Sequence, residues 1–501
     1  MPLIAAESGA PLARLLADQM FSRAAGAAPV EGNAVRLLRD GAENYPAWLA
    51  AIADARSTVH FENYIIRDDE VGRRFADALA AKAREGVAVR LLYDWMGSLG
   101  TPRRTWQRLR EAGVEVRSFN RPRLDSPLGW LGRNHRKTVG VDGRIGFVSG
   151  LCVADVWEGE KAWRDTGIEV IGPAVADLDA AFAQSWAEAG GGVPPATAGD
   201  AHDDHARRGA RAEAHRSAHG DAGPTAAPGL VALRVIASRP NTLGLYRFDQ
   251  IIAGLARRSL WLTDAYFVGT IAYVRALCDA ARDGVDVRLL VPGASDIPVV
   301  QALSRAGYRP LLEAGIRVFE WSGPMLHAKT AVADGRWARI GSSNLNLSSW
   351  IGNWELDVAV DDEGFAAEME AMFEDDLENA TEIVLDLGRV HAASRATRSQ
   401  GRGLRPRRGS PGRLAAGAAG VGSAVGAAIT NHRALGPAEA KVLAGGGAGL
   451  LAFAVAALAF PRVVMLPLAL LAGWVALALL VRAWRLRRAA RAEPPLPAPA
   501  A

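Results

Sequence analysis

The sequence contains few cysteines: two in 501 residues, Cys152 and Cys278. This number excludes the network of disulfides on which small secreted domains depend, and it is typical of proteins in a reducing compartment. Stability must therefore come from buried apolar side chains. Half of the residues are hydrophobic, which is enough for more than one core and for roughly three structural units of ordinary domain size.

Acidic residues are scarce in the C-terminal part of the chain. Residues 388–501 contain 16 Lys and Arg but two acids, whereas residues 1–387 contain 42 basic and 52 acidic residues. The body therefore has a net charge of −10 and the tail one of +14. A net-negative body argues against nucleic acid as a partner, because nonspecific binding to phosphate backbones needs clustered basic groups. The basic tail favours an anionic membrane surface.

The N-terminus has no basic segment followed by an apolar run, so we expect no secretory signal. Leu12, Leu15, Leu16 and Met20 share one face of a helix at a spacing of three to four residues. Residues 1–30 are therefore predicted to form a helical extension. Docking of this helix on the body is favoured over a position on a membrane surface.

Two long segments of the chain repeat the same order of patterns. STVHFENYI (57–65) and SLWLTDAYF (259–267) are each followed by a helical stretch and then by GVAVRLLYD (86–94) or GVDVRLLVP (284–292). A glycine before an apolar, β-branched run marks the end of a helix and the start of a buried strand. Aligning the tyrosines of the two copies places Glu62 on Asp264. The order predicts an α/β fold in which two duplicated domains, residues 31–189 and 230–387, form a pseudo-twofold dimer.

Residues 190–229 lack apolar periodicity and are predicted to be a flexible linker. The linker holds four of the nine histidines, but their spacing is not characteristic of a metal site, and we expect no metal. Residues 388–440 are predicted to be a second, basic linker.

Two uncharged apolar stretches, 442–460 and 463–481, follow. Each is long enough to cross a hydrocarbon core of roughly 30 Å. Residues 441–482 are therefore predicted to form a two-helix membrane hairpin, and residues 483–501 a basic, proline-rich tail. Arginines on both outer flanks place both ends in the cytoplasm. A re-entrant hairpin is the alternative, because glycines at 445–449 weaken the first helix.

Two copies of one motif carry the chemistry: His135-x-Lys137-x4-Asp142 and His327-x-Lys329-x4-Asp334. On a strand, residues i and i+2 point to the same face, so each histidine is expected beside its lysine. A neutral imidazole can attack phosphorus, and an ammonium group can neutralise the charge that builds on the phosphate oxygens. Each aspartate precedes a glycine and is predicted to close a turn, and as members of the motifs Asp142 and Asp334 are also included among the candidate catalytic residues.

Lysine is also scarce, which makes its position in the motifs informative. Of 58 basic residues only five are lysines, and two of these occupy equivalent motif positions. Lysine is a compact point charge that a planar guanidinium does not replace. A structural role alone does not explain two such motifs at corresponding places in a duplicated chain.

The paired motifs resemble the HKD motifs of the phospholipase D superfamily, and the flanking sequence is similar to bacterial cardiolipin synthases over residues 30–387. The family's G-S/G-x-N pattern matches Gly341-Ser342-Ser343-Asn344, and the resemblance implies that Ser342 and Asn344 help to hold a phosphate. In the first copy, Cys152 stands where asparagine is usual. In place of the family's more usual N-terminal anchor, two apolar stretches occur near the C-terminus.

The resemblance also implies a carboxylate downstream of each histidine, at a similar spacing in both copies. Asp165 follows His135 in this way, and Glu355 follows His327. Each acid is expected to fix the tautomer of its histidine and to stabilise the imidazolium. The spacing predicts that each pair forms within one copy.

The implied activity is transfer of a phosphatidyl group through a phosphohistidine, without a cofactor. By analogy His135 is the nucleophile and His327 the acid and base. Cardiolipin synthesis from phosphatidylglycerol at the cytoplasmic face of a bacterial inner membrane is the leading hypothesis. A hydrolase or head-group exchanger that releases phosphatidic acid is the alternative, and a nuclease or an inactive scaffold is less favoured. The sequence does not indicate an oligomeric state.

Overall fold

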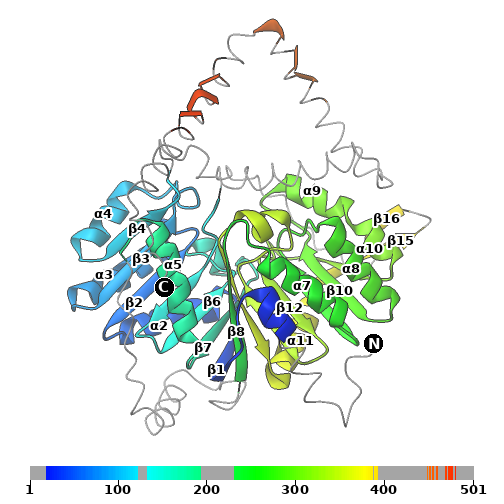
Figure 1. The fold of residues 1–501 in the computed structure, drawn as a ribbon, viewed down its shortest axis with the longest axis horizontal. Helices are drawn as coiled ribbons and strands as arrows, with labels where there is room; N and C mark the ends of the chain where they lie inside the picture. Colours follow the sequence, from blue (N-terminus) through cyan, green and yellow to red (C-terminus); the bar gives the residue numbers. More distant parts are fainter. Residues whose placement is uncertain are drawn as a thin grey trace, which may run out of the picture.

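The computed structural model describes residues 19–121, 132–192, 231–386 and 389–392, together with scattered positions between 448 and 480. The described chain forms two α/β halves that share one continuous series of strands (Figure 1). The strands follow the order β16-β15-β11-β10-β9-β12-β13-β14-β8-β1-β7-β6-β5-β2-β3-β4. From the central β8/β1 pair outward, β8, β14, β13, β12, β9, β10 and β11 correspond to β1, β7, β6, β5, β2, β3 and β4. The predicted duplication is confirmed.

The strands of the first half are β1 (Val30–Arg39), β2 (Thr58–Asn63), β3 (Ala88–Asp94), β4 (Glu115–Phe119), β5 (Thr138–Val141), β6 (Ile145–Ser149) and β7 (Thr166–Ile171). Those of the second half are β8 (Val231–Ser238), β9 (Ser259–Asp264), β10 (Asp286–Pro292), β11 (Arg317–Trp321), β12 (Lys329–Ala333), β13 (Trp337–Gly341), β14 (Glu355–Asp361), β15 (Ala380–Asp386) and β16 (Arg389–Ala392). In each half three consecutive strands of the sheet, β2 to β4 and β9 to β11, are parallel, and the strands nearer the centre are antiparallel.

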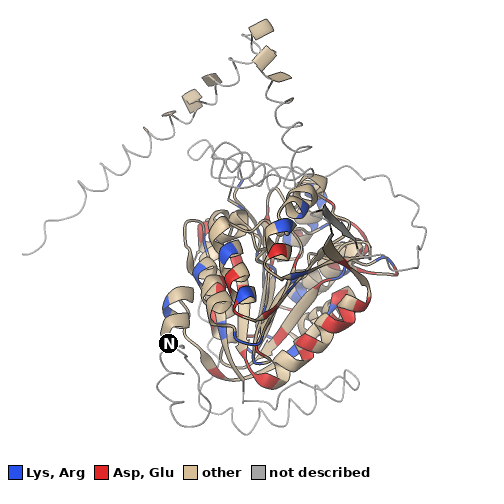
Figure 2. Ribbon diagram, turned by 90° about the vertical axis from the view of Figure 1, so that its right-hand side faces the viewer, with Lys and Arg blue, Asp and Glu red and all other residues tan. Residues whose placement is uncertain are grey.

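Helices cover the sheet in each half. The first half contains α2 (Asp40–Asp54), α3 (Glu70–Arg84), α4 (Arg103–Glu111), the short η2 (Asp155–Trp157) and α5 (Val175–Glu188). The second contains α7 (Gly244–Leu255), α8 (Ile271–Arg282), α9 (Pro298–Ala306), α10 (Tyr308–Glu313), the short η3 (Ser348–Gly352) and α11 (Glu363–Glu378). Acidic and basic residues both occur along α3, whereas α11 has acidic residues and no Lys or Arg (Figure 2).

The glycines that the sequence predicted at the ends of helices lie in the turns that lead from helix to strand. Gly86 and Gly284 both have φ of +92°, a conformation that other residues rarely adopt, and each lies between a helix and a buried strand. The N-terminus of α3 is capped by Asp69, whose carboxylate accepts a hydrogen bond from the Gly72 amide at 2.9 Å. These local signals fix where the repeated elements begin and end.

One core joins the halves. Val35, Val148 and Ile168 of the first half pack in the same buried cluster as Ile340 and Val358 of the second. At roughly 25 cal/mol per Å² of apolar surface, burial of such side chains is the main force that holds the halves together. The two halves therefore form one structural unit around the centre of the sheet.

The predicted superposition of Glu62 on Asp264 is wrong by one residue. Glu62 lies opposite Thr138 in the β2/β5 pair, whereas Thr263 lies opposite the equivalent Thr330 and Asp264 opposite Lys329. The structural equivalent of Asp264 is therefore Asn63. The second copy has one more residue between the strand and its tyrosine. An alignment made on the two tyrosines therefore shifts the two strands by one residue relative to each other.

Several predicted segments lie wholly or largely outside the described residues: most of the N-terminal extension, both linkers, the hairpin at 441–482 and the final tail. Within the described parts of the chain, no helix has the length and apolar character needed to cross a bilayer.

Candidate active site

The two motif histidines lie at one edge of the sheet, where the halves meet. His135 and Lys137 directly precede β5, while His327 precedes β12 and Lys329 begins it. Both lysines are 1% exposed, and the side chains of His135 and His327 are 11% and 7% exposed. The lysines are therefore enclosed, whereas a small part of each imidazole is exposed to solvent.

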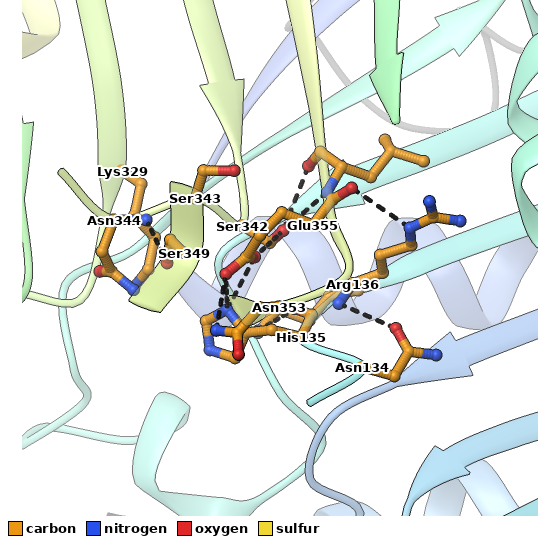
Figure 3. A network of polar contacts seen from close by, with 12 residues as sticks. Asn134, His135, Arg136, Lys329, Ser342, Ser343, Asn344, Ser349, Asn353 and Glu355 are labelled. Atoms are coloured by element: carbon orange, nitrogen blue, oxygen red, sulfur yellow. Dashed lines mark hydrogen bonds and ion pairs between the residues drawn. The ribbon is translucent and has the colours of Figure 1, made fainter. Parts of the chain in front are cut away.

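Each histidine is paired with a carboxylate from the other half. The Nδ1 atom of His135 lies 2.9 Å from Oε2 of Glu355 (Figure 3), and Nδ1 of His327 lies 2.8 Å from Oδ2 of Asp165. The prediction that each pair forms within one copy is therefore wrong. The four residues were identified from the sequence, but their partners are exchanged across the interface.

The exchange follows from the backbone at the interface. The amide of His135 donates to the Trp354 carbonyl at 2.8 Å, and the amide of His327 donates to the Arg164 carbonyl at 2.7 Å. The chain before each motif thus pairs with the residue that precedes the carboxylate of the other half. Because the two halves are related by a pseudo-twofold axis, each carboxylate lies next to the motif histidine of the opposite half.

The two carboxylates are held by different donors. The Ser342 hydroxyl donates to Oε2 of Glu355 at 2.6 Å. Gly150 occupies the equivalent position in the first half, where a Cβ atom would lie 2.1 Å from Oδ1 of Asp165. The Trp157 indole supplies the missing donor to Oδ2 of Asp165 at 3.0 Å. Ser342 therefore positions a carboxylate, and Trp157 has the same role although no sequence pattern indicated it.

Aromatic rings border both histidine–lysine pairs. The Tyr64 ring packs edge-on against His135 at 4.9 Å between centroids, and Tyr266 packs in the same way against His327 at 5.8 Å. The Nζ atoms of Lys137 and Lys329 lie 5.4 and 5.8 Å from the centres of these tyrosine rings. In the sequence, the occurrence of a tyrosine at the same place in both repeats was the feature that indicated these contacts. Such cation–π contacts stabilise the charged form of lysine.

The electrostatics favour neutral imidazoles beside ionised carboxylates. Burial lowers the pKa of both histidines, and the neighbouring lysines lower it further; that of His327 falls to about 3. Burial raises the pKa of Asp165 and Glu355, but contacts with the histidines and lysines outweigh it, so the net pKa of each carboxyl is lowered. A carboxylate at Nδ1 holds the proton there and leaves Nε2 free as a nucleophile.

The lysines predict how activity depends on pH. Burial, together with Lys137, lowers the pKa of Lys329 to about 8, although Asp165 and Asp264 oppose the shift. The charge is present below this value and is lost above it, so kcat/KM for a phosphodiester substrate is expected to fall as the pH rises through about 8. A profile that stays flat to pH 10 would show that charge on Lys329 is not required.

The two motif aspartates close turns, as the sequence predicted. Asp142 and Asp334 have φ of 54° and 56° and precede glycines with positive φ. The Asp142 carboxylate accepts hydrogen bonds from the amides of Arg56, Ser57 and Thr58. The Asp334 carboxylate accepts those of Arg257, Arg258 and Ser259. Both lie at the far ends of β5 and β12, so neither aspartate is placed to contact a substrate at the histidines. Their inclusion among the candidate catalytic residues is therefore wrong, and their role is to close the turns.

The positions predicted to hold a phosphate differ between the halves. Asn344 is 5% exposed, and its side-chain oxygen has no hydrogen-bond partner in the described structure. Cys152, at the equivalent place, is 1% exposed, and burial raises the pKa of its thiol. A neutral thiol is a weak donor, so the first half offers a phosphate less hydrogen bonding than the second.

A layer of buried polar groups supports the first motif. Asn134 donates to Glu62 at 2.6 Å, and its own amide donates to Asp94 at 2.9 Å. The Arg136 guanidinium donates to the carbonyls of Glu355, Ala181 and Ser238, and it is 0% exposed. Arg136 thereby ties the first motif to the strand that carries Glu355. In the sequence, Arg136 is the residue between the motif histidine and lysine, and no pattern there indicated its contact with the Glu355 carbonyl.

No group of three or more potential metal ligands occurs among the described residues. The histidines of the first linker, His202, His205, His215 and His219, lie outside them.

Comparison with known proteins identifies relatives of the whole two-half body. Residues 48–154 and 251–377 match the family model described as "Cardiolipin synthase, PLD-like domain". The chain is 37% identical over 365 residues to cardiolipin synthase A of Pseudomonas fluorescens strain SBW25, covering 70% of each protein. It is also 37% identical over 361 residues to cardiolipin synthase A of Pseudomonas aeruginosa strain LESB58, covering 70% of this chain and 68% of that protein.

A solved structure shares the fold. The phosphatidylserine synthase of Haemophilus influenzae Rd KW20 superposes with a TM-score of 0.54 at 17% identity, covering 72% of this chain and 92% of that one. At this level of identity the likeness concerns the arrangement of strands and helices alone.

Proposed function

The chain belongs to the cardiolipin synthase family of phospholipase D-like proteins, and from this membership we propose that it is a phosphatidyltransferase that makes cardiolipin from phosphatidylglycerol. One observation supports the chemistry above all others: two neutral histidines, each held by a carboxylate of the opposite half, lie at the interface of the halves beside two buried lysines. Such a pair can act as nucleophile and as acid–base on one phosphodiester.

In the first step, Nε2 of His135 attacks the phosphorus of one phosphatidylglycerol. The bond from phosphorus to the head-group glycerol breaks, and His327 donates a proton to the leaving glycerol oxygen. The phosphate anion, together with Asp165, stabilises the protonated form of His327 when the substrate binds. Lys137 and Lys329 neutralise the phosphate oxygens as negative charge develops, and Asn344 donates a hydrogen bond to one of them.

In the second step, His327 removes the proton from a glycerol hydroxyl of a second phosphatidylglycerol. That oxygen attacks phosphorus, the bond between phosphorus and His135 breaks, and cardiolipin leaves. Water in place of the alcohol would give phosphatidic acid, so the hydrolase alternative shares the same intermediate. The enclosure of the lysines and the small exposure of the histidines favour an acceptor that excludes water from the histidines when it binds.

Lipid analysis of a bacterial host that lacks its own cardiolipin synthases tests this function. Expression of the chain is expected to restore cardiolipin, detected by mass spectrometry, with a stoichiometric release of glycerol. Accumulation of phosphatidic acid without cardiolipin would support the hydrolase instead. A variant with both His135→Asn and His327→Asn serves as the matched negative control.

We also propose that the two apolar stretches at 442–460 and 463–481 form a membrane hairpin that keeps the body at the cytoplasmic face. The length of the two stretches and their lack of charge support this, as do the arginines on their outer flanks. A membrane tether is expected to increase activity because the lipid substrate stays in the bilayer and does not diffuse through water to the enzyme. Moving about 30 methylene groups of a diacyl lipid into water costs roughly 24 kcal/mol at about 0.8 kcal/mol each.

Deletion of residues 441–501 tests the tether. The truncated protein is expected to lose at least about tenfold in its rate on bilayer phosphatidylglycerol, because enzyme and substrate are no longer held at one surface. Its rate on a short-chain, micellar substrate should change much less. Equal losses on both substrates would mean that the tail supports the body instead of the membrane contact.

A further inference from the structure

The exposed apolar side chains of the body gather at one edge of the sheet. Among the large apolar residues that are exposed in the described part of residues 19–392, all but Met20 lie on loops or first helical turns at this edge. They are Leu99, Val156, Ile271, Val299 and Leu347, with exposed fractions between 42% and 53%. Scattered exposed apolar residues are ordinary, but their collection at one edge marks an interaction surface.

The topology explains why these residues share an edge. Leu99 follows β3, Ile271 follows β9 and Val299 follows β10, and each of these strands is parallel to its neighbour in the outer sheet of its half. The carboxyl ends of parallel strands meet at one edge. β6, which precedes Val156, runs in the same direction as β3 within the first half, and β13, which precedes Leu347, runs in the same direction as β9 within the second. The two edges meet at the motifs, where the amides of His135 and His327 donate to carbonyls of the opposite half. Figure 1 shows α4 and α9, which begin at this edge, at the top of the two halves.

The same edge contains the candidate active site. Lys329 lies opposite Asp264, the last residue of β9, and Thr138, next to Lys137, lies opposite Glu62 near the end of β2. Two of the exposed apolar residues directly adjoin the site. Val156 precedes Trp157, the donor to Asp165. Val299 is the second residue of α9, the helix that follows Asp296, and the Asp296 carboxylate accepts a hydrogen bond from the Tyr266 hydroxyl at 2.8 Å.

Exposed arginines lie among these loops. Arg103 begins α4, Arg121 follows β4, and Arg239 follows β8. Acidic residues, Asp155 and Glu160, are also exposed at this edge. The body as a whole carries residues of both signs (Figure 2) and has a net charge of −10, so attraction to anionic lipid must come from local arginines. Apolar side chains beside arginines suit the boundary between phospholipid head groups and acyl chains.

We propose that this edge is the surface on which the body docks onto a phospholipid bilayer, with Leu99, Val156, Ile271, Val299 and Leu347 entering the interfacial region around the candidate active site. The proposal rests on the proposed function, because a phospholipid substrate requires the site to reach the head-group plane. It adds the orientation of the body: the carboxyl ends of β3, β9 and β10 face the membrane, and the turns at Asp142 and Asp334 face away.

The orientation can be measured without catalysis. Single cysteines are introduced as Ile271→Cys, Val299→Cys or Leu347→Cys in the full chain, labelled with an environment-sensitive fluorophore, and reconstituted in vesicles of phosphatidylcholine and phosphatidylglycerol. The two native cysteines are buried. Arg144→Cys is the matched control, because Arg144 is exposed in the turn between β5 and β6 at the opposite edge.

Lipids that carry a quencher in the upper acyl chain are expected to quench the labels at positions 271, 299 and 347 at least about threefold more than the label at position 144. Equal quenching at all four positions, or more at position 144, would overturn the proposal.

A kinetic test separates this surface from the chemistry. Ile271→Asp combined with Leu347→Asp is expected to lower kcat/KM on phosphatidylglycerol vesicles by about tenfold or more and to leave the rate on a water-soluble short-chain substrate within about twofold. A wild-type protein inactive on both substrates would refute the proposed function while leaving the quenching result interpretable. Unchanged activity of the double variant on vesicles would contradict the docking surface.

Discussion

Replacing either motif histidine with asparagine is expected to lower turnover by roughly four orders of magnitude or more. Each imidazole performs a step that no neighbouring side chain can take over, since Lys137 and Lys329 are enclosed beside the two rings. The two variants should nevertheless differ. With His327→Asn the nucleophile remains, and the slow reaction is expected to leave phosphatidyl groups bound to the enzyme, because no base activates the acceptor.

Labelled phosphatidylglycerol shows this difference. After denaturation at alkaline pH, where the phosphorus–nitrogen bond survives, label should remain on His327→Asn and be absent from His135→Asn. Circular dichroism and thermal unfolding check that both variants fold. Label on His135→Asn instead would reverse the assignment of nucleophile and acid–base, and wild-type turnover in either variant would refute the two-histidine mechanism.

Removing the charge of either carboxylate is expected to have the second largest effect. Glu355→Gln and Asp165→Asn should each lower kcat by roughly three to four orders of magnitude, because the amide no longer holds the Nδ1 proton or stabilises the imidazolium. Glu355 and Asp165 are both 0% exposed, so solvent cannot replace them. Glu160→Gln, the loss of an exposed carboxylate in the same half as Asp165, is the matched control and should change kcat by less than about twofold.

Removing the hydrogen-bond donors to the two carboxylates is expected to have a smaller effect. Ser342→Ala removes the hydrogen bond to Glu355 at 2.6 Å, and Trp157→Phe removes the one to Asp165 at 3.0 Å while keeping most of the ring. Each is expected to lower kcat by about tenfold, since a single hydrogen bond to a charged group is worth about 1.5–3 kcal/mol. An unchanged kcat in both variants would mean that the backbone alone positions the carboxylates.

The motif residues of the site could be predicted from the sequence because the patterns that identify them depend on short spacings along the chain. The i, i+2 relation on a strand brings His135 beside Lys137 and His327 beside Lys329, and the D-G pairs predict the turns at Asp142 and Asp334. The duplication was visible because GVAVRLLYD and GVDVRLLVP repeat a buried strand. These features depend on neighbours in the chain, so one sequence contains them.

The partners of the histidines could not be predicted because they depend on contacts between the halves. Asp165 belongs to the same half as His135 but pairs with His327, 162 residues away along the chain. The number of residues between His135 and Asp165 is the same whether Asp165 pairs with His135 or with His327. The spacing therefore cannot distinguish the two arrangements. Trp157 and Arg136 were missed for a similar reason: their contacts arise from the packing of η2 and of β14 against the first motif. No periodicity in the sequence reports such packing.

The exchange of carboxylates is the central claim, and a substrate with a good leaving group tests it most directly. Nitrophenolate departs without a proton, so the first step on a phosphatidyl nitrophenyl ester needs the nucleophile and its carboxylate but not the acid. A burst of nitrophenol close to one per enzyme is therefore expected from His327→Asn and Asp165→Asn. It should be absent from His135→Asn and Glu355→Gln. A burst that is lost in Asp165→Asn and retained in Glu355→Gln would contradict the crossed pairing.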